Sequence, residues 1–462
     1  MGGHPREERA RPRRNPYPPP VLRPGGRLWG TPSRFPSPPR SMYVSLQRAA
    51  LLLLLPALAS AQKLRQSSSP PTRWDGLVVE VQPGSSIASV LQGTGLRMVA
   101  SIAGTSTYLV RAQAGTPRGA LVPLLRQLRS NPGARYAAPN ALGSSPESNS
   151  CRPGPRPTAQ PCTVAFVDGT PTLAEYTGQP AVTNVQAAQA AALSGARSSI
   201  VAVIDTGIDP THSVFQGRLL SLGYDFIEDR PGAIDIADGK DTNGNGSVDE
   251  AFGHGTHIAG TIALINPYAK ILPYRVLDSD GIGSAFQVAC AIHAAVDTGC
   301  DVINLSLSMT TRSRVVHEAI DRAEEAGIVV VSSAGNTGGK GVTFPASLND
   351  VVAVAAVDDA DLRAPFSAFG LRVGLSAPGV GIYSAFPGER WARWSGTSMA
   401  SAVASGVVSL TTSSVPTLLP DPKEPTLEAT VSLSSANPLL VGLLGTGRVD
   451  AYEAVEEALQ QN

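Results

Sequence analysis

Short apolar segments alternate with segments of helical pattern along most of the sequence after about Gln186. The apolar segments are rich in Val, Ile and Ala, as expected for buried strands: Ile200–Ile204, Ala269–Val276, Val302–Leu307, Ile328–Ser332 and Val351–Val357. Strands that alternate with helices are typical of βαβ units, in which each helix connects two parallel strands. The alternation therefore predicts an α/β domain over residues 180–462, with a largely parallel sheet flanked by helices.

A different and shorter pattern precedes this domain, over residues 74–142. Strand-like and helical segments follow one another in the order β-α-β-β-α-β: Gly76–Val81, Ser86–Leu91, Arg97–Ile102, Ser106–Ala112, Leu121–Leu128 and Arg135–Asn140. This order is the signature of a ferredoxin-like unit. We therefore predict a small α+β domain whose last strand lies at the edge of its sheet.

The N-terminal region has the pattern of a targeting signal. Residues 42–61 combine a basic start, an apolar run over Ala49–Leu58 and an A-x-A end at Ala61, which is the layout of a signal peptide. A buried core helix is the alternative, and the run is too short to span a bilayer. Residues 1–41 are rich in Arg and Pro, and we expect a misassigned translation start or a disordered leader there. The protein is therefore expected to be secreted, into an extracellular or periplasmic space.

Composition identifies linkers and excludes some partners. Residues 62–73, and residues 143–179 with their Ser-, Pro- and Gly-rich first part, read as linkers. Lys and Arg total 37, as do Asp and Glu, so the chain as a whole lacks the basic footprint of a nucleic-acid-binding protein. Apart from the signal, the sequence has no apolar segment long enough to suggest a membrane span.

The chain has four cysteines: Cys151, Cys162, Cys290 and Cys300. An even number in an exported chain predicts disulfides, and four cysteines allow three connectivities. Local pairs close short loops, so we expect Cys151–Cys162 and Cys290–Cys300, with no free thiol. Metal binding by these residues is not expected, because no C-x-x-C spacing occurs.

Three motifs hold the residues of a nucleophilic hydrolase. Asp205 ends an apolar strand, His254 lies between two glycines at an apparent helix start, and Ser398 follows a Gly-Thr turn. Each residue alone has an ordinary explanation, as a turn residue, a structural histidine or a helix cap. Together they supply a hydroxyl, a base and a carboxylate that orients the base, in the chain order Asp…His…Ser found in subtilisin.

Residues 180–455 resemble the subtilisin-like serine proteases, because these motifs match the family's signatures nearly letter for letter. Further segments agree with the family pattern: Tyr274–Asp278, Val302–Leu307, Ser333–Asn336, Ser376–Gly379 and Gly447–Ala451. The resemblance implies a serine endopeptidase that acts on proteins or peptides, with no further C-terminal domain. Ser398 would be the nucleophile, His254 the base and then the acid, and Asp205 the group that orients His254. Asn336 and the Ser398 backbone N–H would bind the oxyanion.

The resemblance also implies where substrate binds. The segments concerned hold Ser306, Leu307, Ser308, Ala334 and Gly335. The sequence departs from the family at Ser308, where glycine is usual, and at Ala402, where proline is usual. A side chain at position 308 would narrow the specificity pocket or change its polarity. We expect broad specificity with a preference for apolar or aromatic residues, although the nearby Lys340 could instead favour acidic ones.

The unit over residues 74–142 resembles, more weakly, the propeptide of such enzymes. Its Tyr136–Asn140 segment resembles the family's last propeptide strand. In the family, this domain assists folding and then inhibits the enzyme with its tail in the substrate site. The chain is therefore expected to be its own first substrate, cut within Ala141–Cys151, because a tethered tail has a high effective concentration.

A polar loop before the histidine motif is a candidate calcium site. Oxygen-bearing side chains alternate along Asp241–Glu250, at Asp241, Asn243, Asn245 and Asp249. Phe252 stands where a calcium loop usually has Glu, and a solvated Asx-rich turn is the alternative. Catalysis itself needs no cofactor in this family. A metal pair of His254 with His257 is not expected, because the family uses the second histidine structurally.

Two other functions fit the same fold. An inactive binding or scaffold protein would show a damaged triad or lack Asn336, and the sequence shows neither. A peptide ligase or transpeptidase would use the same acyl-enzyme but exclude water from it, which a sequence does not reveal. Casein hydrolysis with and without a serine-directed inactivator separates the protease from the scaffold.

Overall fold

The computed structural model describes residues 76–113, 120–147, 165–166, 173–415 and 423–461. Pro71–Asn462 forms one compact unit. The predicted leader, signal peptide and first linker lie outside the described residues, as do Cys151 and Cys162. Among the helices within the described ranges, none is long and apolar enough to cross a membrane.

The first part of the compact unit has the predicted ferredoxin-like order. Its elements are β1 (Leu77–Val81), α2 (Ile87–Leu91), β2 (Leu96–Ser101), β3 (Thr107–Ala112), α3 (Leu121–Ser130) and β4 (Ala134–Pro139). The strands pair antiparallel in the order β2-β3-β1-β4, so β4 lies at the edge as predicted. Leu77 and Val79 of β1 and Leu125 and Leu128 of α3 belong to the apolar core of this unit.

The α/β domain is built on a ten-stranded sheet with the order β19-β20-β16-β15-β14-β12-β7-β10-β8-β9. Its strands are β7 (Ile200–Asp205), β8 (Tyr224–Asp225), β9 (Arg230–Pro231), β10 (Lys270–Arg275), β12 (Val302–Leu305), β14 (Val329–Ser333), β15 (Val351–Val357), β16 (Leu375–Pro378), β19 (Thr430–Val431) and β20 (Arg448–Val449). All neighbours pair parallel except β8–β9 and β19–β20 at the two edges. The predicted, largely parallel sheet is therefore confirmed.

Helices cover both faces of this sheet, because its strands are apolar on both sides. In β7, Val201 and Val203 belong to one core cluster, whereas Ala202 and Ile204 belong to the other. The first cluster includes α7 (His254–Ile265) and α10 (Thr397–Ser414), and the second includes α8 (Ala285–Thr298) and α9 (Arg314–Glu325). Side chains alternate between faces along a strand, and this pattern is typical of a sheet buried on both sides.

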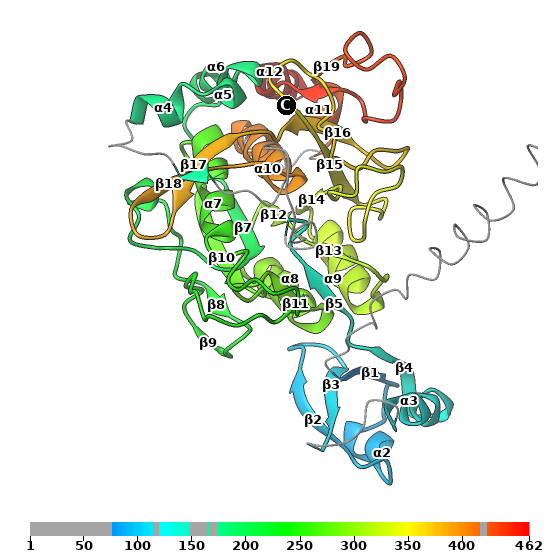
Figure 1. Cartoon of the computed structure of the whole chain (residues 1–462). Helices are drawn as coiled ribbons and strands as arrows, with labels where there is room; N and C mark the ends of the chain where they lie inside the picture. The colour runs from blue at the N-terminus through cyan, green and yellow to red at the C-terminus, as the bar shows by residue number, and fades with distance from the viewer. Residues whose placement is uncertain (1–75, 114–119, 148–164, 167–172, 416–422, 462) are drawn as a thin grey trace, which may run out of the picture. The chain divides into compact units, whose positions relative to one another are not determined.

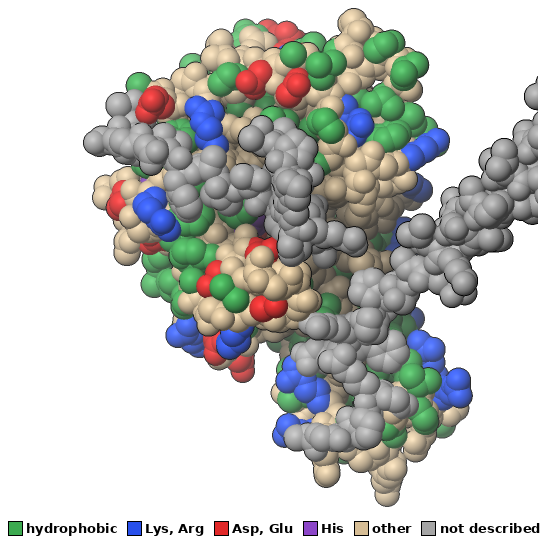
Figure 2. All heavy atoms as spheres, viewed as in Figure 1, with side chains coloured by type: hydrophobic (Ala, Val, Ile, Leu, Met, Phe, Trp, Pro, Cys, Tyr) green, Lys and Arg blue, Asp and Glu red, His purple; other side chains and the backbone are tan. Residues whose placement is uncertain are grey.

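Smaller elements complete the domain. They are α4 (Leu173–Thr177), α5 (Pro180–Asn184), α6 (Ala187–Leu193), η3 (Ser213–Phe215), α11 (Glu424–Glu428) and α12 (Ala451–Gln461). Acidic and basic side chains are interspersed over the α/β domain in the view of Figure 2.

Residues 143–179 were predicted to be a linker, but the described part of this segment contributes strands to two small sheets. One has the order β11 (Ile282–Ser284), β5 (Leu142–Ser144), β13 (Ser308–Met309), and the other β17 (Ile382–Phe386), β18 (Arg390–Trp394), β6 (Ala165–Phe166). The supposed linker thus contributes most of β5, all of β6 and the helix α4. Its strands are short and pair with residues far away in the chain, so the local sequence does not reveal them.

The predicted Cys290–Cys300 disulfide is wrong, because both residues are free thiols. Cys290 lies inside α8, which continues to Thr298 before the chain reaches Cys300. Eight helical residues rise about 12 Å, whereas a disulfide needs Cα atoms within about 7 Å. Burial raises the pKa of each of these two thiols to about 12.

Candidate active site

Asp205 and His254 form a buried pair at the carboxyl end of the sheet. Asp205 is the last residue of β7, and His254 is the first of α7. Their Oδ1 and Nδ1 atoms lie 2.7 Å apart, and Asp205 Oδ1 also accepts a hydrogen bond from Thr206 N–H at 2.7 Å. A Cβ at Gly255 would clash with the Gly207 backbone, so glycine is required for α7 to approach β7 this closely.

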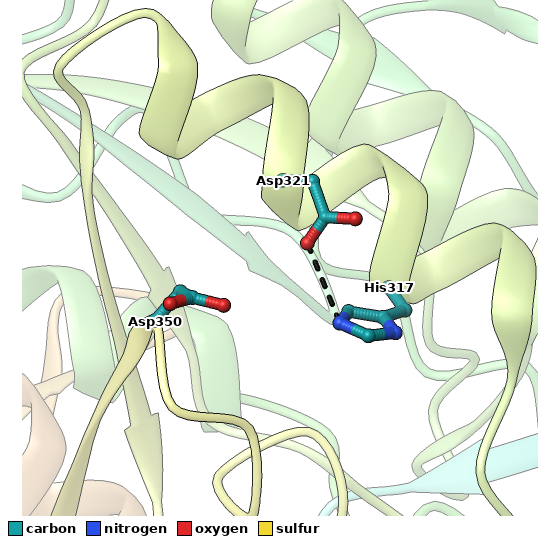
Figure 3. A group of neighbouring side chains, drawn as sticks. All are labelled: His317, Asp321 and Asp350. Atoms are coloured by element: carbon teal, nitrogen blue, oxygen red, sulfur yellow. Dashed lines mark ion pairs between the residues drawn. The ribbon is translucent and has the colours of Figure 1, made fainter.

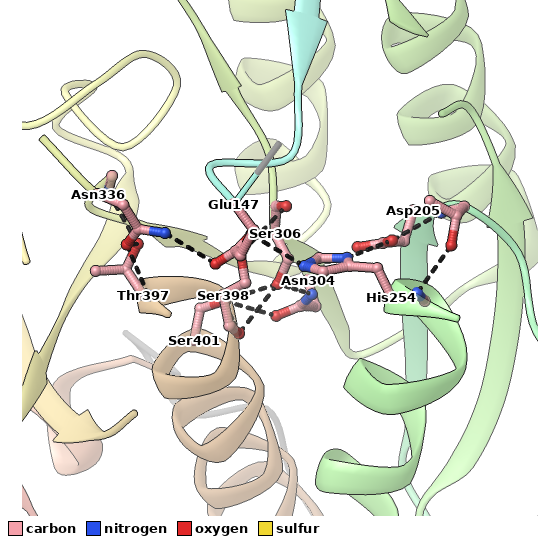
Figure 4. A network of polar contacts seen from close by, with 12 residues as sticks. Glu147, Asp205, His254, Asn304, Ser306, Asn336, Thr397, Ser398 and Ser401 are labelled. Atoms are coloured by element: carbon pink, nitrogen blue, oxygen red, sulfur yellow. Dashed lines mark hydrogen bonds and ion pairs between the residues drawn. The ribbon is translucent and has the colours of Figure 1, made fainter. Parts of the chain in front are cut away.

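Ser398 lies in the first turn of α10, held by a buried polar network (Figure 4). Its carbonyl accepts hydrogen bonds from Ser401 Oγ at 2.9 Å and from Ser306 Oγ at 3.2 Å. Asn304 extends this network by donating to Ser306 Oγ at 3.0 Å. The first turn of α10 is thus fixed by side-chain hydrogen bonds even though Ala402 replaces the proline usual in the family.

The side-chain amide of Asn336 is held beside Ser398 by Thr397 (Figure 4). Its Oδ1 accepts hydrogen bonds from Thr397 N–H at 3.0 Å and from Thr397 Oγ1 at 2.9 Å. A backbone N–H can only donate, so the oxygen must face Thr397, and the NH₂ group points away from Thr397 into the site. Asn336 is therefore oriented as a hydrogen-bond donor to the site.

A residue that sequence reasoning missed, Glu147, occupies the point where these groups meet (Figure 4). Its Oε2 accepts a hydrogen bond from Ser398 Oγ at 2.8 Å and lies 3.1 Å from His254 Nε2. Its Oε1 accepts one from Asn336 Nδ2 at 3.0 Å. Glu147 is a single acidic residue in a Ser-, Pro- and Gly-rich stretch, so nothing in its local sequence indicates this position.

The segment that carries Glu147 is paired on both sides as an extra strand. Ser144 of β5 lies opposite Ile282 of β11 and Ser308 of β13, and both pairings are antiparallel. Ser145 N–H also donates to Gly281 O at 3.0 Å. Ser308, which the resemblance implies to bind substrate, thus pairs with a segment of the chain itself, and the pairing of β11 on the other side of β5 was not predicted.

The other four predicted substrate-binding residues contact neighbouring residues of the domain itself. Ser306 binds the Ser398 carbonyl, and Leu307 is fully buried in the apolar core. Gly335 N–H donates to Thr397 Oγ1 at 3.1 Å, and Ala334 N–H donates to Val354 O at 2.9 Å. Of the five predicted substrate-binding residues, Ser308 is the one that pairs with β5.

The charges of the site favour a protonated His254. Burial by itself would lower the pKa of His254, but the carboxylates of Asp205 and Glu147 outweigh burial and raise it to about 10. His257 is different, because burial and the neighbouring His254 lower its pKa to about 3. His257 Nε2 contacts the carbonyl oxygens of Ile382 and Ala392 at 3.1 and 3.3 Å, which fits the expected structural role.

In the predicted calcium loop, the carboxylate oxygens of Asp241 and Asp249 accept hydrogen bonds from backbone N–H groups. Asp241 accepts from the N–H groups of Gly244, Asn245 and Gly246, and Asp249 Oδ1 accepts from those of Asp238 and Gly239. These contacts are those of an Asx-rich turn. They do not exclude an ion, because a carboxylate can accept several partners.

The carboxylates of Glu250 and Asp280 beside this loop form a second candidate site for a cation. Asn243 and Asn245 both direct Nδ2 to Glu250 Oε2, at 2.8 and 2.6 Å. Asp280 Oδ2 accepts from Asn243 N–H at 2.9 Å, while its buried Oδ1 has no hydrogen-bond partner within the described residues. Burial, followed by the Glu250 and Asp278 carboxylates, raises the pKa of Asp280, as expected where acidic groups crowd together without a cation.

A third candidate for a metal lies on the surface (Figure 3). Within the described residues, His317, Asp321 and Asp350 form the one group of three His, Cys, Asp or Glu side chains whose ligand atoms lie within 4.8 Å of one another. His317 Nε2 and Asp321 Oδ1 are 3.4 Å apart at i,i+4 on α9, with side chains 46% and 45% exposed. Such exposed helix pairs are common without an ion.

The comparison with protein families agrees with this arrangement. A family model described as the subtilase family matches residues 196–447, which is more than half of the chain. The chain therefore belongs to the subtilase family.

Individual relatives and one solved structure are similar to the chain. Thermostable alkaline protease from Halalkalibacterium halodurans is 40% identical over 48% of this chain and 58% of its own length. Thermitase from Thermoactinomyces vulgaris is 36% identical over 49% of this chain and 79% of its own length. The crystal structure of fervidolysin from Fervidobacterium pennivorans, 23% identical, has the same fold, with a TM-score of 0.64 over 85% of this chain and 62% of that one. The chain spans little more than half the length of two of its curated relatives, 58% and 52%.

Proposed function

We propose that the protein is a serine endopeptidase that hydrolyses peptide bonds through an acyl-enzyme on Ser398. The support is that the catalytic residues predicted from the sequence converge on one point, where Glu147 bonds to Ser398, His254 and Asn336. The family of the chain adds to this support.

In the proposed reaction, Ser398 Oγ attacks the scissile carbonyl carbon while its proton passes to His254 Nε2. Asp205 holds Nδ1 and stabilises the imidazolium that forms. The oxyanion accepts hydrogen bonds from Asn336 Nδ2 and from the Ser398 backbone N–H. The C–N bond then breaks as His254 gives its proton to the leaving amine. Water, deprotonated by His254, releases the acyl group in the same way.

We further infer that the chain is exported as a zymogen that processes itself. The support comes from Leu142–Ser144, which pair with β11 and β13 as a substrate strand would, and from Glu147, which follows them and binds Ser398. Val78 and Leu109 of the ferredoxin-like unit also share an apolar cluster with Phe286 of α8. The 74–142 unit and its tail would therefore act as an intramolecular inhibitor, with the cut within Ala141–Cys151.

The variant Ser398→Ala tests both proposals, because it removes the nucleophile without adding bulk. It should accumulate as an uncut precursor and leave casein intact, whereas the wild type matures and hydrolyses casein until a serine-directed inactivator is added. Maturation of purified Ser398→Ala at the wild-type rate, without added protease, would overturn the nucleophile assignment and the self-processing together.

We also propose a structural calcium ion at the loop before α7. The carboxylates of Asp280 and Glu250 would hold it, with Asp241 bracing the loop, and the Asp280 Oδ1 that has no hydrogen-bond partner within the described residues supports this choice. Calcium prefers carboxylate and amide oxygens, and here it would offset the crowded negative charge. The loop leads into His254, so the ion would stabilise the start of α7.

A further inference from the structure

A buried carboxylate with no role in the mechanism above, Asp235, lies next to the Asp205–His254 pair. The residue is 7% exposed. Its backbone segment is bound to the residues that follow β7, since Ile208 N–H donates to Ala233 O at 2.9 Å and Asp235 N–H donates to Ile208 O at 3.0 Å. Asp235 is therefore fixed to the end of the strand that carries Asp205.

The carboxylate of Asp235 is bound to the first turn of α7. Oδ2 accepts hydrogen bonds from Thr256 Oγ1 at 2.8 Å and from Thr256 N–H at 3.4 Å, and Oδ1 accepts one from Gly253 N–H at 3.2 Å. Gly253 and Thr256 lie on either side of His254 in the sequence. Asp235 thus holds the helix turn that presents His254.

This cap must come from outside the helix. The N-cap of α7 is Gly253, which has no side chain to accept the N–H of the third helical residue, Thr256. A Cβ at position 253 would clash with the Phe386 ring, and φ there is +85°, so a capping Ser, Thr or Asp does not fit. Asp235 supplies from another segment the acceptor that this helix start lacks.

The charge of Asp235 also reaches the reacting pair. Burial, countered by the hydrogen bonds from Thr256 and Gly253 and reinforced by Asp205, raises the pKa of Asp235 to about 6. The ionisable group that acts on the Asp235 carboxylate is Asp205 of β7, which pairs with His254 of α7. An ionised Asp235 therefore adds negative charge beside the Asp205–His254 pair and favours the protonated form of His254.

We propose that Asp235 is a positioning residue for the reaction proposed above: through Gly253 and Thr256 it fixes the first turn of α7, so that His254 keeps Nδ1 on Asp205 and Nε2 toward Ser398. It touches no substrate and acts through this helix turn and through its charge. The inference rests on the proposed function. A small misplacement of a catalytic base can lower the rate by a large factor.

The test compares mature Asp235→Asn and wild-type enzyme on a soluble peptide substrate between pH 5 and 9. Asn keeps the size of Asp, but it removes the charge and one acceptor oxygen. We expect kcat to fall about tenfold or more with KM nearly unchanged. The acid limb of kcat/KM should also move to lower pH, because His254 loses a neighbouring anion. A loss of stability would lower only the amount of active enzyme, so kcat is counted per active site titrated with a serine-directed inactivator, and the acid limb does not depend on that amount.

The matched control is Asp301→Asn, which alters a carboxylate at the other end of β7. Asp301 Oδ2 accepts from Ile200 N–H at 2.7 Å, so it also binds a backbone amide of this region without touching α7. The control should keep the wild-type kcat and acid limb. An unchanged kcat and pH profile in Asp235→Asn, or an equal loss in Asp301→Asn, overturns the inference.

A second pair of variants serves if Asp235→Asn does not mature. Thr256→Val removes the hydroxyl that binds Asp235, and Thr256→Ser keeps it. The Val variant should lose kcat as Asp235→Asn does, and the Ser variant should recover it. Equal activity of Thr256→Val and Thr256→Ser would contradict the inference. The proposed function fails by a different result, namely that Ser398→Ala hydrolyses the substrate as fast as the wild type.

Discussion

The carboxylate of Glu147 accepts a hydrogen bond from the Ser398 hydroxyl at 2.8 Å, although 251 residues separate the two in the chain. The group that meets the proposed nucleophile is thus a side chain and not a peptide carbonyl. A side-chain carboxylate does not acylate Ser398, and in this place it fills the space that a scissile carbonyl needs. In the proposed zymogen this arrangement would be inhibited, and the first cut would require Glu147 to leave.

Replacing Glu147 should speed up maturation of the precursor. Glu147→Ala and Glu147→Gln both remove the charge that binds His254, and Ala also empties the site. We expect the mature form to appear several-fold faster than in the wild type, followed by gel electrophoresis after refolding. Glu453→Gln, an exposed glutamate on α12, should mature at the wild-type rate. Equal rates for all of these proteins would contradict the inhibitory role of Glu147.

The stability of the precursor should fall as the pH rises from about 6.5 to 10. The pKa of His254 is raised from 6.5 to about 10 by Asp205 and Glu147 despite burial, so the folded state binds this proton more tightly than the unfolded state. The resulting stabilisation is complete below pH 6.5 and is lost as the pH passes through the folded pKa.

This dependence can be measured by thermal unfolding of the uncut Ser398→Ala precursor at several pH values. The same protein with Glu147→Gln should lose less stability over this pH range, because one of the two carboxylates that raise the pKa is gone. Parallel curves for the two proteins would show that Glu147 does not act on His254.

Asn336→Ala should lower kcat of the mature enzyme about 100- to 1,000-fold, with a small effect on KM. The amide of Asn336 is aimed at the site by Thr397, and its hydrogen bond to an oxyanion forms fully only in the transition state. Steady-state kinetics on a peptide substrate decide this. Thr337→Ala, an exposed neighbour on the same turn, should behave as the wild type. A variant that raises KM alone would assign Asn336 to ground-state binding.

Calcium should raise the melting temperature of the mature protein, and a chelator should lower it. At an ion concentration 100 times Kd, the stabilisation is about 2.7 kcal/mol, which corresponds to a shift of about 5 °C for a domain of this size. Asp280→Asn should abolish most of the response, because it removes the negative charge of the carboxylate whose Oδ1 is unpartnered.

The control for calcium is Asp321→Asn, in the exposed group of Figure 3. It should keep the full calcium response if the ion lies at the loop before α7. A response lost in Asp321→Asn and kept in Asp280→Asn would move the site to α9, and no response in the wild type would end the calcium proposal.

The local sequence was sufficient to predict the sheet and the placing of the proposed triad. Apolar strands such as Ile200–Asp205 and glycines such as those around His254 encode burial and backbone conformation over a few residues, and these determine where a strand ends or a helix begins. The strand end explains the position of Asp205, whereas grouping it with His254 and Ser398 depended on the three motifs and their resemblance to the family.

Tertiary structure alone decided the contacts between segments far apart in the chain. Glu147 reaches Ser398 because β5 pairs with two distant strands, and Asp235 caps α7 because Gly253 leaves no room for a local cap. The predicted Cys290–Cys300 bond failed because α8 separates residues that are close in sequence. Local patterns determine local backbone conformation and burial, whereas long-range contacts depend on how the whole chain packs, which no short stretch of sequence specifies.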